Sequence, residues 1–242
     1  MKVTTSNLIR CAGLAAIVGG ILFVVMQAIH PPETLASVTT AAWTTVHYMG
    51  VAMCVFTLVG IAGIYLRQVE ETGWLGLAGF VLLGLMWTLT AAFQFAEGFI
   101  LPPLAAEAPR FVEGFVGIPA GAASEVSLGM LPTVNSLAGV MYLLGGLLLG
   151  SATFRAGVLP RWAGAALAAG TVAPLVLTLL LPHELVRLAA VPMGLALAWL
   201  GYALWSERRE PTLELLPGRA RSQPTETAVV VLEPRTAAGG TE

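Results

Sequence analysis

The residues best able to do chemistry lie near the end of an apolar run from Trp74 to Leu101, where Gln94 and Glu97 interrupt an otherwise nonpolar stretch. A carboxylate inside or just beneath a bilayer surface is costly, so a residue of this kind is a candidate functional group. Gln94 and Glu97 are one helical step apart and would share a helix face, which Thr90 extends by a further turn. Glu97 is therefore the first candidate for a binding or acid-base role.

Three histidines and one asparagine are predicted to lie at the same depth as Glu97. His47 falls about one turn inside a second apolar run, and Asn135 lies near the start of another. His30 and His183 lie at the ends of apolar runs. Polar residues that are far apart in the chain but collected at one depth predict an outward-facing pocket centred on Glu97 and His47. The candidate ligand-binding residues are Glu97, His47, Gln94, Asn135 and Thr90.

A pocket of imidazole and carboxylate groups suits Zn²⁺ and similar ions, or proton transfer. The chain has no HxxxH or HExxH spacing, so His30, His47 and His183 are only weak metal-ligand candidates. Haem is disfavoured as well, because paired haem ligands face each other across a bundle, whereas these histidines gather at one end. We therefore predict no cofactor.

The composition excludes several classes of function. All 14 acidic residues are Glu, so sites that need Asp for Mg²⁺ or for a phosphoaspartate are absent. Lys2 is the only lysine, which excludes a buried Schiff-base lysine and a phosphate-binding Gly-Lys loop. The net charge of −2 indicates no attraction to nucleic acid.

The elements that would position these residues are helices in a lipid bilayer. Hydrophobic residues make up 57% of the chain and charged residues 11%, against about 25% charged in soluble domains. This predicts an all-α, polytopic transmembrane bundle over residues 1–206 and a disordered cytoplasmic tail over residues 207–242. Pro102 and Pro103 are expected to end the third span, and residues 102–127 to form a re-entrant or interfacial segment that acts as a lid. The six expected spans cover about 11–29, 42–66, 74–101, 131–154, 162–181 and 185–205.

The positive charges predict that both termini are cytoplasmic, because Lys and Arg accumulate in cytoplasmic loops. With that orientation only Arg110 and Arg187 lie on the outer side. The inner segments hold Lys2, Arg10, Arg67, Arg155, Arg161, Arg208 and Arg209.

Small residues are expected to hold the helices together, since helices in lipid associate through close backbone approach. Gly146 and Gly150 form a GxxxG step. Gly139 and Gly146 are seven residues apart, as are Gly194 and Gly201, which is the spacing of a left-handed helix contact.

The segment Gly150 to Gly170, GSATFRAGVLPRWAGAALAAG, resembles a joint between two spans in an uncharacterised family of six-helix bacterial integral membrane proteins, a domain of unknown function. The resemblance rests on Gly150, Arg155, Leu159, Pro160, Arg161, Trp162 and Gly164. It implies a six-helix protein of the bacterial plasma membrane and implies no activity.

The function that these observations favour is a non-catalytic membrane module that binds or moves a small molecule or lipid from the outer side. One alternative is a membrane enzyme that uses Glu97 with His47 as acid and base, and another is a structural or regulatory subunit. Its surroundings would be the lipid bilayer, and a second copy or another membrane protein is a possible partner. Binding or transport predicts a cavity that reaches the middle of the membrane, whereas an enzyme predicts a closed outer pocket.

Overall fold

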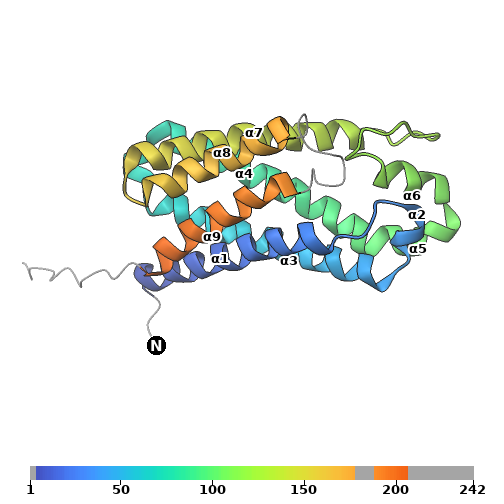
Figure 1. The fold of residues 1–242 in the computed structure, drawn as a ribbon, viewed down its shortest axis with the longest axis horizontal. Coiled ribbons are helices and arrows are strands. Elements are labelled where there is room, and N and C mark those ends of the chain that lie inside the picture. The colour runs from blue at the N-terminus through green and yellow to red at the C-terminus, as the bar shows by residue number, and fades with distance from the viewer. Residues whose placement is uncertain (1–3, 178–187, 207–242) are drawn as a thin grey trace, which may run out of the picture. The chain divides into compact units, whose positions relative to one another are not determined.

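A computed structural model describes residues 4–177 and 188–206, and these ranges contain helices and no strand (Figure 1). The predicted all-α bundle is thereby confirmed. The helices are α1 (Thr5–Ile29), α2 (Leu35–Val38), α3 (Ala41–Leu66), α4 (Val69–Phe95), the π-helix η1 (Ala96–Ile100), α5 (Leu101–Glu107), α6 (Pro109–Val116), α7 (Leu131–Ala156), α8 (Arg161–Leu177) and α9 (Val191–Ser206).

Most of the long helices suit a lipid bilayer. Within the described residues, five stretches are long and apolar enough to cross a membrane: α1, α3, the continuous helix Val69–Glu107, α7 and Leu188–Ser206. The apolar helix α8 has 17 described residues. Large apolar side chains such as Leu8, Val55 and Leu195 are more than half exposed, which water would oppose and lipid tails would favour. These helices indicate a membrane protein.

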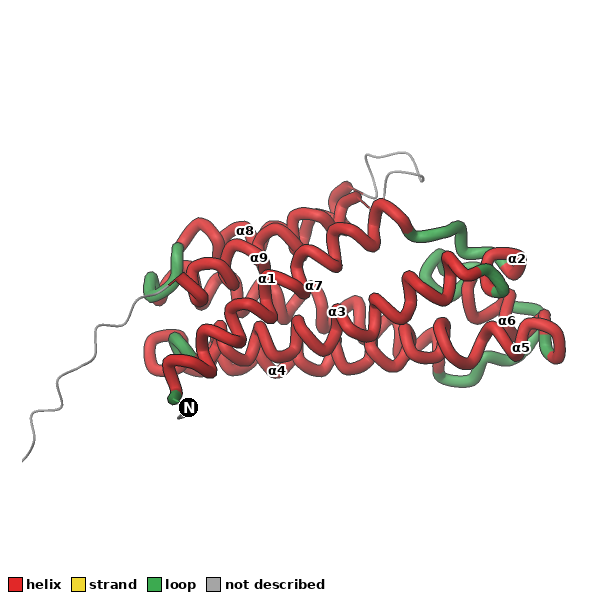
Figure 2. Tube along the Cα trace, turned by 90° about the horizontal axis from the view of Figure 1, so that it is seen from below, coloured by secondary structure: helices red, strands yellow, loops and turns green. Residues whose placement is uncertain are grey.

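The six long helices in the described part of the chain form a closed ring. α1 packs on α3, α3 on α4, α4 on α7, α7 on α8, α8 on α9, and α9 returns to α1. Figures 1 and 2 show the first and last helices of this ring side by side, with the start of α1 and the end of α9 at the same end of the bundle. We call this the terminal end, and the opposite end, which carries α2, α5 and α6, the cap end.

Glycines line the contact that closes the ring. A Cβ atom on Gly13 would lie 2.8 Å from the carbonyl oxygen of Gly201, and one on Gly201 would lie 2.6 Å from that of Gly13. Gly20 and Gly194 oppose each other in the same reciprocal way. The sequence interpretation singled out Gly194 and Gly201 but not their partners on α1, which share the seven-residue spacing.

Hydrogen bonds fasten the terminal end. The Arg10 guanidinium donates through Nε to the Trp205 carbonyl oxygen at 3.2 Å, which joins α1 to α9. The Gln68 side-chain amide donates to the Thr153 hydroxyl at 2.7 Å, and both side chains are fully buried. The turn between α3 and α4 is thus bonded to α7.

The third long helix differs from the predicted span 74–101 at both of its ends. Gly73 has a φ of 54°, which breaks the helix next to Trp74 and which glycine adopts without a Cβ penalty. The helix does not end at Pro102 and Pro103 but continues to Glu107. These prolines occupy the first turn of α5, where the missing N–H groups cost least. The π-helix η1 precedes them, and its Leu101 N–H bonds to the Ala96 oxygen.

The cap end has a small core of its own. Residues 102–127, expected to be a re-entrant or interfacial lid, contain α5, α6 and turns. Their apolar side chains pack with α2 and with the first turn of α3. The buried members of this cap core are Val38, Trp43, Leu101, Ala105, Val112, Phe115, Val116 and Ile118.

Parts of two predicted spans and the tail lie outside the described residues. These are residues 178–181 of the fifth span, residues 185–187 of the sixth, and the tail over residues 207–242.

Candidate functional site

The structure brings Glu97 and His47 together at the cap end. His47 lies in the second turn of α3, a helix that begins where the Thr40 hydroxyl accepts a hydrogen bond from the Trp43 N–H. Glu97 lies in η1, which turns its side chain toward α3. The Trp43 indole N–H donates to the Glu97 backbone oxygen at 2.8 Å and fixes the two helices to each other.

The two side chains meet at ion-pair distance. His47 Nε2 lies 3.1 Å from Glu97 Oε2; the His47 side chain is fully buried and that of Glu97 is 12% exposed. Nε2 has no hydrogen-bond partner among the described residues.

His30 lies next to this pair but does not complete a metal site. Its ring centroid is 5.2 Å from that of His47 and 5.8 Å from that of Trp43, and its Nδ1 donates to the Pro31 oxygen at 2.7 Å. Among residues 4–177 and 188–206, no three His, Cys, Asp or Glu side chains gather closely enough to hold a metal ion. The third weak candidate, His183, lies outside the described residues.

Gln94 packs on the same neighbouring helix as Glu97. Its side chain lies against the backbone of Gly50 on α3, in the space that a Cβ atom there would occupy. Its Oε1 atom is buried and has no hydrogen-bond partner among the described residues. Gln94 therefore serves the α3–α4 contact.

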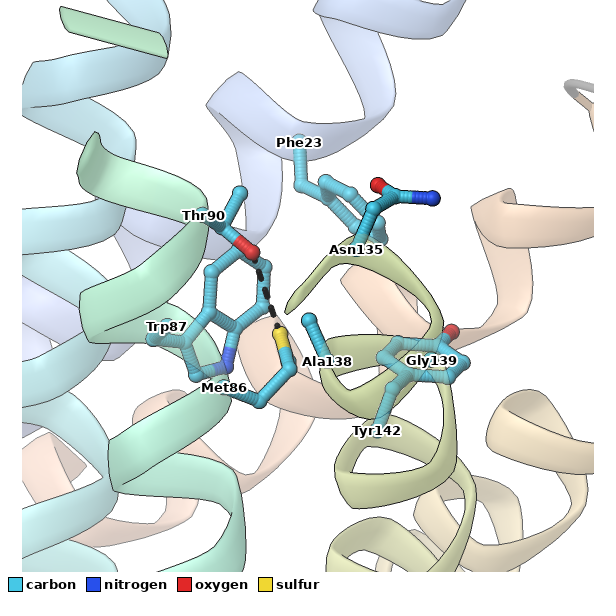
Figure 3. Close-up of a pocket in the computed structure, with 8 residues that line it drawn as sticks. All are labelled: Phe23, Met86, Trp87, Thr90, Asn135, Ala138, Gly139 and Tyr142. Atoms are coloured by element: carbon cyan, nitrogen blue, oxygen red, sulfur yellow. Dashed lines mark hydrogen bonds between the residues drawn. The ribbon is translucent and has the colours of Figure 1, made fainter. Parts of the chain in front are cut away.

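Thr90 and Asn135 belong to a different place, a cavity of about 270 Å³ within the ring of helices (Figure 3). Neither Glu97 nor His47 lines it. The single polar pocket expected from the sequence is therefore two separate features. The cavity is lined by Phe23 of α1, by Met86, Trp87 and Thr90 of α4, and by Asn135, Ala138, Gly139 and Tyr142 of α7.

The cavity wall offers hydrogen-bond donors but no charge. Trp87 is 1% exposed and its indole N–H has no hydrogen-bond partner among the described residues. The Thr90 hydroxyl reaches only the Met86 sulfur, at 3.3 Å, which is a weak acceptor. Asn135 adds an amide on the opposite wall, and none of the eight lining residues carries a charge at neutral pH.

Sequence reasoning missed the aromatic part of this wall. Trp87 is one helical step before Thr90, so extending the polar stripe by another turn would have reached it. Gly139 and Tyr142 follow Asn135 by four and seven residues and share its helix face. Gly139 was expected to pack against another helix, but a Cβ atom there would meet nothing within 4 Å among the described residues.

Comparison of the chain with protein families, with curated proteins and with solved structures finds no match.

Proposed function

We propose that this protein is a multi-pass protein of the cell membrane that binds an uncharged small molecule in the cavity between α1, α4 and α7. The ligand enters from the cap end, which faces the outer side. The observation that carries the proposal is a cavity of about 270 Å³ that is lined by aromatic and apolar side chains together with the Thr90 hydroxyl and the Asn135 amide.

The depth of the cavity supports binding within the membrane. Asn135 lies one turn from the start of α7, whereas Tyr142 and Trp87 lie near the middle of α7 and of the long helix Val69–Glu107. The cavity thus extends from near the cap end to mid-bundle. A cavity of this depth is what binding or transport of a small molecule requires.

The wall chemistry defines the class of ligand. Phe23, Trp87 and Tyr142 present aromatic surface, and a mostly apolar wall with a few polar groups is typical of small-molecule sites. The Asn135 amide and the Thr90 hydroxyl can donate hydrogen bonds, so the wall suits an acceptor such as a carbonyl oxygen. The ligand is therefore apolar or aromatic, uncharged, and carries at least one carbonyl or ether oxygen.

The orientation follows the positive charges. Arg10, Arg67, Arg155 and Arg161 all lie beside helix boundaries at the terminal end, where the start of α1 meets the end of α9. Because Lys and Arg favour cytoplasmic loops, this end is cytoplasmic. The cap end, with Arg110 as its described basic residue, is outside.

Equilibrium dialysis of the full chain in lipid nanodiscs tests the proposal. The probe is duroquinone, an uncharged ring with two carbonyl oxygens, and durene is the matched hydrocarbon without an acceptor. We expect saturable duroquinone binding and weaker durene binding. Asn135→Leu removes an amide donor from the wall at similar size and should weaken duroquinone binding roughly 3- to 10-fold, the value of one hydrogen bond.

Two glycine variants separate cavity binding from partition into lipid. Gly139→Leu fills the cavity and should abolish saturable binding, whereas Gly84→Leu makes the same change on α4 where a Cβ atom also meets nothing, away from the cavity wall. Equal uptake of both probes by the wild type and Gly139→Leu would contradict the proposal.

A further inference from the structure

Two arginines lie on the short joint between α7 and α8, at the terminal end of the bundle (Figure 1). Arg155 lies in the last turn of α7, and Arg161 is the first residue of α8. Both side chains are exposed, and neither forms an ion pair with another described residue. The hairpin of α7 and α8, residues 131–177, contains no Asp or Glu. The joint therefore carries two positive charges without an acidic partner on its own hairpin.

Gly157 lets the Arg161 side chain fold back over the joint. Gly157 follows α7 with a φ of 66°, which glycine adopts without a Cβ penalty. A Cβ atom there would lie 2.8 Å from Arg161 Nε, so the Arg161 side chain reaches a point two residues after Arg155. Leu159, which is 4% exposed, anchors the joint in the core. Both arginines therefore belong to one short, anchored segment.

Aromatic side chains indicate the depth of the joint in the membrane. Trp162 is 72% exposed, and its ring meets that of the exposed Phe154 edge to face, with centroids 5.9 Å apart. Trp74, near the start of the neighbouring helix α4, is 83% exposed. Exposed tryptophans of membrane proteins favour the level of the lipid headgroups. The two arginines beside Phe154 and Trp162 therefore lie at the depth of the lipid phosphates.

The chemistry of the joint matches that of an anionic phospholipid. A guanidinium group presents paired N–H donors that fit the oxygens of a phosphate. The exposed rings of Phe154 and Trp162 suit the glycerol and the first part of an acyl chain. We propose that the joint, residues 154–162, binds the headgroup of an anionic glycerophospholipid such as phosphatidylglycerol. This site is separate from the cavity, because neither Arg155 nor Arg161 lines the cavity.

The acidic residues of the adjoining helix leave the two arginines available. Glu70 and Glu71 are exposed in the first turn of α4, which follows the turn bonded to α7. Neither glutamate forms an ion pair with Arg155 or Arg161. A lipid phosphate that binds the joint therefore displaces no carboxylate of the described residues.

Quenching of tryptophan fluorescence by brominated lipids tests the site. The full chain is reconstituted in phosphatidylcholine vesicles that contain either dibrominated phosphatidylglycerol or dibrominated phosphatidylcholine. The contribution of Trp162 is the difference between the wild type and Trp162→Phe, which changes an exposed side chain. We expect phosphatidylglycerol to quench this contribution more strongly, with its association preferred by about 5-fold for each arginine.

The double variant Arg155→Gln/Arg161→Gln should lose this preference while its circular dichroism stays that of the wild type. Arg110→Gln removes an exposed arginine at the cap end and, as the matched control, should keep the preference. Inorganic phosphate at matched ionic strength should not displace the lipid, because it has no acyl chains to lie on Phe154 and Trp162.

Three results would overturn the proposal. They are equal association of the two lipids with the wild type, a preference that survives in the double variant, and displacement of phosphatidylglycerol by inorganic phosphate. The first and the third need no arginine variant, so they do not depend on whether the double variant folds.

Discussion

The two halves of α7 use the same residue type for opposite purposes. Toward the terminal end, Gly145, Gly146 and Gly150 lie against α4 or α8 so closely that an added Cβ atom would collide with them. Toward the cap end, Gly139 faces the cavity, where an added Cβ would meet nothing nearby. A glycine in a membrane helix thus indicates close packing in one half and room for a ligand in the other.

The largest expected effect is on folding. It comes from comparing a leucine at Gly150 with a leucine at Gly139, one in each half of α7. A Cβ at Gly150 would lie 2.6 Å from the Ala168 nitrogen and the Gly164 oxygen, which are backbone atoms that cannot yield. Gly150→Leu should therefore lower the free energy of unfolding by about 3 kcal/mol or prevent folding. Gly139→Leu should preserve stability or raise it by up to about 1 kcal/mol, through helix propensity.

Unfolding of both variants in mixed detergent micelles, followed by circular dichroism, measures this difference. Similar losses of stability at the two positions would show that the two halves of α7 are packed alike, which would contradict the proposed difference between them.

A smaller effect is expected from the buried hydrogen bond at the terminal end. Thr153→Val leaves the buried Gln68 amide without its partner and should cost about 1 to 2 kcal/mol. The double variant Gln68→Leu/Thr153→Val should recover part of that loss, because no buried donor is then left unpaired. A double-mutant cycle on the free energy of unfolding measures the coupling, and a coupling near zero would show that this end is not fastened by the bond.

The smallest effect is expected from the ion pair on the cap. Arg110 and Glu125 are 75% and 78% exposed, so water screens their attraction. Arg110→Ala should change the free energy of unfolding by less than about 0.5 kcal/mol. Thermal unfolding measures this change, and Val112→Ala, which truncates a fully buried residue of the cap core, is the comparison variant with the larger expected loss. An equal loss of stability in both variants would contradict the prediction.

The sequence predicted the helical bundle well because hydropathy and length alone decide which segments suit a bilayer. The predicted span boundaries could not include the continuation past Pro102, because prolines usually end helices. A π-helix immediately before Pro102 and Pro103 changes the hydrogen-bond pattern, and no residue pattern in Ala96 to Ile100 predicts this π-helix.

The candidate site was harder to predict. The position of a residue along a span predicts its depth in the membrane, but it does not predict which neighbouring helix the side chain faces. Glu97, His47 and Asn135 were expected at one depth, with Thr90 one turn deeper on the face of Glu97. The ring order of the helices directs Glu97 toward α3 and opens the face that carries Thr90 toward α1 and α7. That order depends on contacts between distant segments, which a single sequence does not reveal.

The closure of the ring by its first and last helices has a consequence for biosynthesis. Gly13 and Gly201, which touch across that contact, are about 190 residues apart in the chain. At typical translation rates of roughly 5 to 20 residues per second, α1 waits about 10 to 40 seconds for its partner to be made. Its glycine face is exposed to lipid or to an insertion chaperone throughout that interval, so the ring of helices closes only after α9 has been made.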